Sequence, residues 1–187
     1  MAVTATGFFD GVHLGHRQVV NTLVSAAESR GEESVVITFD RHPREVLGLD
    51  SDGLKILSTL EQRVSMLRGL GVDRVEVLDF TPQFAAMTAR EYIKDILVGR
   101  YGSTLIVMGY DNRLGCDGKG PEEVALMAGE LGVGILVVPP FSCDAGDGEV
   151  IVSSTVIRDI MSGHRQGDAD ALLGYEYFEL DSGRGVK

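Results

Sequence analysis

Two histidines three residues apart, His13 and His16, stand in the glycine-rich stretch GFFDGVHLGH near the start of the chain. In the first turn of a helix, side chains at this spacing share a face, so both imidazoles can reach one anion. Each ring can donate a hydrogen bond to an oxygen that gains negative charge during a transfer. A single histidine there is more often a cap or a surface group, but the pair favours phosphate chemistry.

The glycines around this pair support the same interpretation. Gly7 and Gly11 permit close backbone approach at the end of a strand, and Gly15 lies where a helix begins. Free N–H groups and the helix dipole at that point favour a phosphate. A zinc site is disfavoured, because no third histidine or cysteine stands in a supporting pattern.

The elements that must position these residues alternate along the chain. Short β-branched runs predict strands at 2–6, 34–39, 74–80, 104–109 and 133–140. Apolar residues at helical spacing lie between them, Thr88 and Glu91 fit a capping box, and a further helix is predicted at 121–131. A loop or hairpin is expected at 142–150, followed by a short strand at 150–152. This alternation is typical of a doubly wound parallel α/β sheet with Rossmann-like topology, in one domain.

Composition excludes several classes of function. The formal net charge is -11 with a pI of about 4.7, and the basic residues are scattered, so we expect no nucleic-acid partner. No apolar run approaches the ~20 residues of a membrane span, so no membrane partner is expected. Cys116 and Cys143 are far apart and no signal peptide precedes them, which predicts reduced thiols in a cytoplasmic protein.

Beyond the opening stretch, several segments resemble one family in order along nearly the whole chain. GFFDGVHLGH resembles the H-x-G-H signature of the nucleotidyltransferase superfamily, and its Phe-Asp-Gly lead-in is most similar to bacterial FAD synthetases. The similar segments that follow are TFDRHPREVL, LSTLEQRVSMLRGLGVDRVEVLDFT, GYDNRLGCDGKG and VSSTVIRDIMSGHRQGDADALLG. The resemblance implies a nucleotidyltransferase fold and transfer of AMP from ATP to FMN, which gives FAD and pyrophosphate.

The resemblance also implies roles for individual residues. His13, His16 and Arg158 would act on the phosphates of ATP as the catalytic groups. The nucleotide would be bound by Gly7, Phe8, Asp10, Gly15, Ser153, Ser154 and Thr155. FMN would be bound by His42, Pro43, Arg44, Asp111 and Arg113, the first three on a loop. Asp111 is also the candidate ligand for Mg²⁺. An ordinary helix cap at Ser153, a surface turn at His42 and a turn-forming aspartate at Asp111 remain the alternatives.

The chain departs from the family pattern at several places, among them Asp40 and Arg41 before His42-Pro43 and the lack of a leading segment before the first strand. Asn112 and Leu114 stand where the family usually has aromatic residues, so the packing of the flavin or adenine ring is open. The bifunctional members continue into a riboflavin kinase barrel, whereas this sequence stops at Lys187. We therefore expect an adenylyltransferase domain at 1–174, a tail at 175–187, no riboflavin kinase domain, and dependence on a separate source of FMN.

Three alternatives remain. A related H-x-G-H transferase would use another phosphorylated acceptor, such as a phosphopantetheine, nicotinamide mononucleotide or a polyol phosphate. A fragment of a class I aminoacyl-tRNA synthetase is disfavoured by the acidic chain and the lack of a Lys-Met-Ser-Lys-Ser loop. A regulator that binds flavin or nucleotide without turnover is the third.

Overall fold

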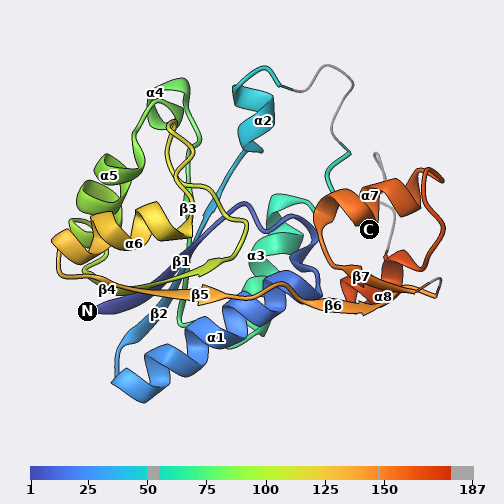
Figure 1. The fold of residues 1–187 in the computed structure, drawn as a ribbon, viewed down its shortest axis with the longest axis horizontal. Helices are drawn as coiled ribbons and strands as arrows, with labels where there is room; N and C mark the ends of the chain where they lie inside the picture. The colour runs from blue at the N-terminus through green and yellow to red at the C-terminus, as the bar shows by residue number, and fades with distance from the viewer. Residues whose placement is uncertain (50–54, 147, 178–187) are drawn as a thin grey trace, which may run out of the picture.

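The core of the protein is a parallel sheet whose central strand is also the first. The computed structural model describes residues 1–49, 55–146 and 148–177. Five parallel strands lie in the order β3-β2-β1-β4-β5. They are β1 (Ala2–Thr6), β2 (Glu33–Phe39), β3 (Arg74–Leu78), β4 (Ser103–Gly109) and β5 (Gly134–Val138). Successive strands are added outward on both sides of β1, which confirms the doubly wound α/β fold (Figure 1).

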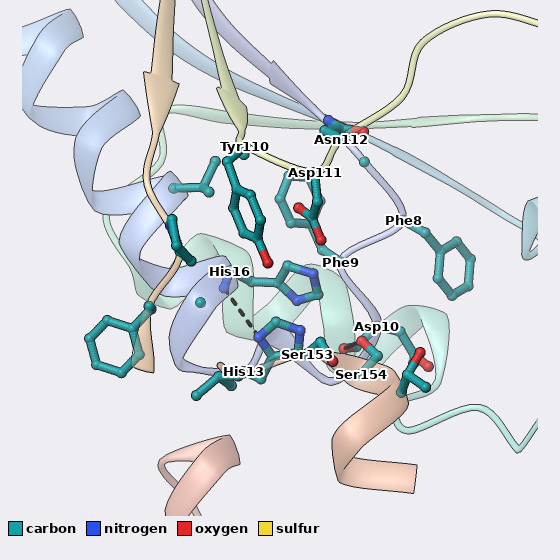
Figure 2. Close-up of a pocket in the computed structure, with 18 of the residues that line it drawn as sticks. Phe8, Phe9, Asp10, His13, His16, Tyr110, Asp111, Asn112, Ser153 and Ser154 are labelled. Carbon is teal, nitrogen blue, oxygen red and sulfur yellow. Dashed lines mark hydrogen bonds between the residues drawn. The ribbon is translucent and has the colours of Figure 1, made fainter. Parts of the chain in front are cut away.

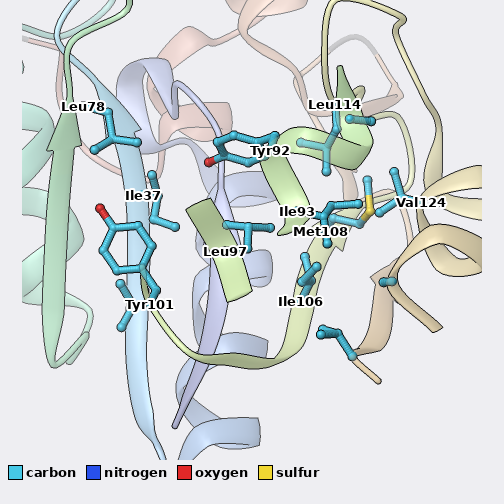
Figure 3. Packing of buried hydrophobic residues seen from close by; sticks show 14 of the residues in the cluster. Ile37, Leu78, Tyr92, Ile93, Leu97, Tyr101, Ile106, Met108, Leu114 and Val124 are labelled. Carbon is cyan, nitrogen blue, oxygen red and sulfur yellow. The ribbon is translucent and has the colours of Figure 1, made fainter. Parts of the chain in front are cut away.

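Helices cover both faces of the sheet, and each face has its own apolar core. One face carries α1 (Leu14–Arg30) and α3 (Leu60–Gly69); the other carries α4 (Pro82–Ala85), α5 (Ala89–Glu91), the π-helix η2 (Tyr92–Val98) and α6 (Pro121–Glu130). The strands alternate between the two cores: Val36 packs in the α1 core and Ile37 in the core with η2 (Figure 3). Near-complete burial on both faces explains the continuous apolar run at residues 35–37 in β2.

The last described part of the chain forms a small unit beside the sheet (Figure 1). It contains the antiparallel strands β6 (Ser142–Asp144) and β7 (Glu149–Ile151), then α7 (Ser154–Met161) and α8 (Ala169–Leu173). Its own core includes Leu57, Ile157 and Leu172. The hairpin confirms the expectation for 142–150. Of the proposed tail, 178–187 lies outside the described residues.

Several predicted boundaries need correction. The strand predicted at 74–80 ends at Leu78, because the Phe80 N–H donates to the Asp40 carboxylate (2.7 Å) instead of to a strand. The strand predicted at 133–140 ends at Val138, since Pro139 and Pro140 have no N–H. The His42-Pro43-Arg44 segment, predicted as a loop, includes the one-turn helix α2 (Pro43–Val46) with His42 as N-cap.

Helix capping was predictable in part. The capping box of Thr88 and Glu91 is confirmed at the start of α5, and Gly31 ends α1 with φ of 63°. Thr59 and Gln62 form a second capping box, at the start of α3, which the sequence analysis missed. None of the helices in the described ranges is long and apolar enough to cross a membrane.

Candidate functional site

A cleft of about 630 Å³ opens at the carboxyl ends of β1, β4 and β5, with the start of α7 on its other side. Strand order reverses beside β1, and such a reversal is where doubly wound folds bind ligands. We call this space the main cleft. It is lined by every predicted site residue except Pro43: Gly7, Phe8, Asp10, His13, Gly15, His16, His42, Arg44, Asp111, Arg113, Ser153, Ser154, Thr155 and Arg158.

The loop from β1 into α1 is held in an uncommon backbone conformation. A 3₁₀ turn, η1 (Asp10–Val12), follows Phe9, and Phe9, Gly11 and Val12 have positive φ values of 56°, 73° and 38°. Positive φ is costly for a β-branched residue such as Val12, and this kind of strain is concentrated at functional sites. A side chain at Gly11 would be crowded as well as strained, because a Cβ there would lie 3.0 Å from the Cβ of Leu57. The conformation of the loop therefore positions His13 at the start of α1.

His13 and His16 lie in contact at the floor of the main cleft. Their rings stack with centroids 3.6 Å apart and planes at 16°, and Figure 2 shows them between Asp111 and the serines that begin α7. His13 is the N-cap of α1, and its Nδ1 accepts the His16 backbone N–H at 3.3 Å. Since that nitrogen accepts, the proton of a neutral His13 sits on Nε2. His16 Nδ1 is buried and has no partner among the described residues.

The environment keeps both histidines neutral. Burial, and then the charge of Arg158, lowers the pKa of His13 to about 3. Burial also lowers the pKa of His16 well below its usual value, with further contributions from His13 and two nearby arginines. Two neutral imidazoles can each donate one hydrogen bond. Each imidazole therefore meets an anion as a neutral donor and brings no positive charge to it.

Asp10 and Arg158 are linked to each other as well as to the cleft. Arg158 Nη2 lies 2.6 Å from Asp10 Oδ2, and Arg158 Nε donates to the Lys55 carbonyl at 2.8 Å. Asp10 Oδ1 also accepts the backbone N–H groups of Leu57 and Ser58 at 2.9 and 3.2 Å. The Asp10 carboxylate is thus a buried acceptor that joins three segments, while one edge of the Arg158 guanidinium remains for a ligand.

The start of α7 brings hydroxyl groups to the cleft. Ser153 caps the helix by accepting the Val156 N–H at 3.3 Å, and Ser154 Oγ donates to the Asp10 carbonyl at 3.2 Å. Thr155 is exposed at the cleft wall. Across from them, Gly15 allows α1 to approach, since a Cβ there would lie 3.3 Å from the Val152 carbonyl oxygen. The N-termini of α1 and α7 therefore face the same space, where their dipoles favour an anion.

A second cavity adjoins the main cleft. This apolar pocket has a volume of about 250 Å³ and shares Thr6, Gly7, Asn112 and Arg113 with the main cleft. Most of its remaining wall is apolar or aromatic: Phe39, Pro43, Leu47, Phe80, Phe84, Ala85, Met87, Tyr92 and Leu114. Asn112 stands at the shared wall and donates to the Thr6 carbonyl at 3.0 Å. A flat apolar ring with a polar tail could occupy both spaces at once.

The predicted FMN residues divide between the two spaces. His42, Arg44 and Asp111 line the main cleft, Pro43 lines the apolar pocket, and Arg113 lines both. Among the described residues, no three His, Cys, Asp or Glu side chains converge on a possible metal position. Mg²⁺ commonly uses one or two carboxylates and takes its other ligands from phosphates and water. The exposed carboxyl group of Asp111 fits such a partial site.

Two residues that support the site were not predicted from the sequence. Tyr175, in the proposed tail, donates to the Gly11 carbonyl at 2.7 Å, and no local pattern points to that contact. Arg63 is buried on α3 with its guanidinium over the Phe8 ring, 3.9 Å from the ring centroid. A signal was present for Arg63, because it lies four residues before the buried Leu67 on the same helix face.

Similarity to known proteins agrees with this geometry. Residues 1–156 match the model of a family described as FAD synthetase. The bifunctional riboflavin kinase/FMN adenylyltransferase of Listeria monocytogenes is 34% identical over 177 residues, which cover 94% of this chain and 54% of the relative. The bifunctional riboflavin kinase/FMN adenylyltransferase of Bacillus subtilis is 30% identical over 177 residues, which cover 95% of this chain and 54% of the relative. The chain thus spans about half the length of these curated relatives.

Two further similarities extend the comparison. A putative bifunctional riboflavin kinase/FMN adenylyltransferase of Geobacillus thermodenitrificans is 31% identical over 174 residues, covering 93% of this chain and 90% of the relative. A crystal structure of a macrolide-efflux protein from Streptococcus pneumoniae superposes with a TM-score of 0.76 and 27% identity, covering 94% of this chain and 56% of that chain. The fold predicted from the sequence is therefore found in a solved structure.

Proposed function

The chain belongs to the FAD synthetase family, and from this premise we propose that it transfers AMP from ATP to FMN, with FAD and pyrophosphate as products. The observation that carries the proposal is the neutral, stacked pair of His13 and His16, which lies in a cleft that continues into an aromatic-lined pocket. The cleft offers donors for phosphates, and the pocket offers apolar surface for a flavin ring.

The transfer forms one P–O bond and breaks another. A phosphate oxygen of FMN attacks the α-phosphorus of ATP, and the bond from that phosphorus to the bridging oxygen of the β-phosphate breaks, so its electron pair leaves with pyrophosphate. Such transfers depend on positioning and on stabilisation of developing charge. The Nε2–H of His13 and one N–H of His16 would donate to the phosphate oxygens that gain charge.

The remaining donors suit the other phosphates and the nucleoside. Arg158 and the hydroxyls of Ser153, Ser154 and Thr155 would bind the β- and γ-phosphates at the start of α7. Gly7, Phe8 and Gly15 would shape the nucleotide site by close backbone approach. Asp10 would act through its contact with Arg158, whose guanidinium it orients.

The acceptor would enter from the other side. We place the flavin ring in the apolar pocket, against Pro43 and the aromatic wall. His42, Arg44 and Arg113 would then hold the FMN phosphate near the shared wall, with Asp111 facing the same space. Leu114 and Asn112 replace the family's aromatic residues without opening the pocket, because Leu114 is buried in its wall and Asn112 is fixed by Thr6.

Mg²⁺ would be bound by Asp111 together with phosphate oxygens, and would neutralise phosphate charge during the transfer. We also propose a cytoplasmic location, where ATP is available and where thiols such as Cys116 and Cys143, both free, stay reduced.

A competition experiment tests the choice of acceptor. Pyrophosphate release from ATP would be measured with FMN, nicotinamide mononucleotide, a phosphopantetheine and a polyol phosphate, singly and in mixtures. We expect release with FMN and its persistence when the other acceptors are present. Release with a different acceptor would identify a related transferase, and tight ATP and FMN binding without any release would identify a regulator.

A further inference from the structure

Arg63 is a buried cation that no described carboxylate neutralises directly. Its side chain is 1% exposed, and it forms none of the ion pairs found among the described residues. Nη2 donates to the Phe39 carbonyl at 2.7 Å, while the buried Nε has no acceptor there. A charge is costly to bury in this way, so its retention calls for a local reason.

The aromatic contact of Arg63 leads toward the cleft. Its guanidinium carbon lies 3.9 Å from the centre of the Phe8 ring, and the Phe8 ring meets the His42 ring edge-on at 4.6 Å. Phe8 points away from the histidine pair (Figure 2), and its carbonyl is fixed by the Thr38 hydroxyl at 3.0 Å. Arg63, Phe8 and His42 thus form a continuous row of contacts from α3 to α2.

That row ends at the groups proposed to hold the acceptor. Through its Nδ1, His42 caps α2 by accepting the Arg44 N–H at 3.1 Å, so the imidazole fixes the turn that carries Pro43 and Arg44. Phe39, which accepts the hydrogen bond of Arg63, lines the apolar pocket beside Pro43. Arg63 itself lines neither space.

We propose that Arg63 is a positioning residue for the acceptor: by holding Phe8 and the end of β2, it fixes α2 over the apolar pocket and so sets the affinity for FMN. This inference rests on the proposed function. The effect should be larger on FMN than on ATP, because the ring of Phe8 leads to α2, whereas the Phe8 backbone, proposed to shape the nucleotide site, stays fixed by the Thr38 hydroxyl.

The test compares Arg63→Met with Arg68→Met, an exposed arginine on the same helix. We expect Arg63→Met to raise KM for FMN about tenfold, because α2 is no longer preorganised over the apolar pocket, and to raise KM for ATP less than about threefold. Because the charge of Arg63 also acts on His16, kcat is not used to judge the outcome. Arg63→Lys keeps the charge without the planar contact and should be intermediate. Arg68→Met should match the parent.

A turnover-independent measurement distinguishes the outcomes. FMN binding without ATP is followed by flavin fluorescence, and should weaken by the same factor in Arg63→Met. A parent protein that makes no FAD contradicts the proposed function, whereas a parent that makes FAD while Arg63→Met retains its FMN affinity contradicts the role of Arg63. A global loss of packing would instead raise both KM values together.

Phe8→Leu decides the matter if Arg63→Met does not fold. It should weaken FMN binding to a similar extent. Where Arg63→Met does fold, the double variant should bind FMN no more weakly than the weaker-binding single variant, since both changes break one row of contacts. Unchanged FMN affinity in Phe8→Leu, or additive effects of the two changes, would overturn the proposal.

Discussion

The two histidines stack on each other, but they differ in their hydrogen bonds. The Nδ1 of His13 accepts the hydrogen bond that caps α1. This bond fixes the tautomer of His13 and leaves its Nε2–H to donate to a ligand. His16 has no such structural bond, and its buried Nδ1 is without a partner in the described part of the chain. His16 should therefore contribute to the reaction more than to the fold.

At this scale, His16→Ala should lower kcat/KM for FAD formation by about 100-fold or more, because a donor aimed at developing charge is typically worth that much. The far-ultraviolet circular dichroism spectrum should not change. His164→Ala, which removes an exposed histidine outside the cleft, is the matched control. An activity within a few-fold of the parent would remove His16 from the chemistry.

The buried histidines also make stability depend on pH. The folded pKa of His13 is lowered from 6.5 to about 3, and that of His16 is lowered as well. Above pH 6.5 both states of each histidine are neutral, so the full stability is present. As the pH falls from 6.5 toward 3, the unfolded chain binds protons that the folded chain excludes, and stability is lost.

We expect the free energy of unfolding of the ligand-free protein to fall between pH 6.5 and 5 by up to about 1.4 kcal/mol per pH unit for each histidine. Urea unfolding at several pH values measures the slope. His13→Gln should reduce the slope of unfolding free energy against pH by the contribution of one histidine. His164→Gln serves as the control. Parallel curves for His13→Gln and the parent protein would show that His13 takes up a proton in the folded state.

Among the elements, the loop between β4 and α6 depends on one close contact. A Cβ at Gly115 would lie 2.0 Å from the Ala89 nitrogen and 2.4 Å from Asp117 Oδ1, and it would disrupt the hydrogen bond between those two atoms. Gly118 has a similar positive φ, 60° against 73°, yet its Cβ would meet nothing within 4 Å. Alanine at Gly118 would therefore test the cost of the backbone conformation alone, and alanine at Gly115 would test that cost together with the steric contact.

Gly118→Ala should cost about 1–2 kcal/mol of stability, as expected for alanine in the left-handed region. Gly115→Ala should cost about 2 kcal/mol more than that, because the α5 contact must open. It should also raise both KM values, since this loop carries Asp111 and Arg113. Chemical denaturation of the two variants measures the difference, and equal losses would mean that the loop does not rest on α5.

The sequence was most informative about the secondary-structure elements. The start of α1, the caps of α5 and α7 and the hairpin at 142–151 follow from local patterns of apolar, hydroxyl and glycine residues. The ends of β3 and β5 were overestimated, because a side-chain acceptor on Asp40 and two prolines end them. The row from Arg63 to His42 was not predictable, since it joins segments that only the folded sheet brings together.

In the whole molecule, Asp10 connects the loop that follows β1 to α7 through its contact with Arg158. Its partner Arg158 lies 148 residues away, which is why sequence alone placed both in the cleft without pairing them. Asp10→Asn leaves the partly buried guanidinium of Arg158 without its counter-charge. We expect a loss of up to about 3 kcal/mol in the free energy of unfolding, the lower end of the range for a fully buried pair.

Thermal and chemical unfolding of Asp10→Asn would be compared with those of Asp159→Asn, a partly exposed carboxyl group on α7. The control should change little. A similar small change in Asp10→Asn would show that the α7–α8 unit is held by its apolar core alone.

The proposed function requires that His13 and His16 bind the phosphates during adenylyl transfer to FMN. The most direct measurement incubates the purified chain with FMN, ATP and Mg²⁺ and separates FMN from FAD by chromatography, with His16→Ala and a reaction without Mg²⁺ alongside. We predict FAD and pyrophosphate in equal amounts, dependent on Mg²⁺ and lost in the variant. A folded protein that binds ATP and FMN but forms no FAD would contradict this account.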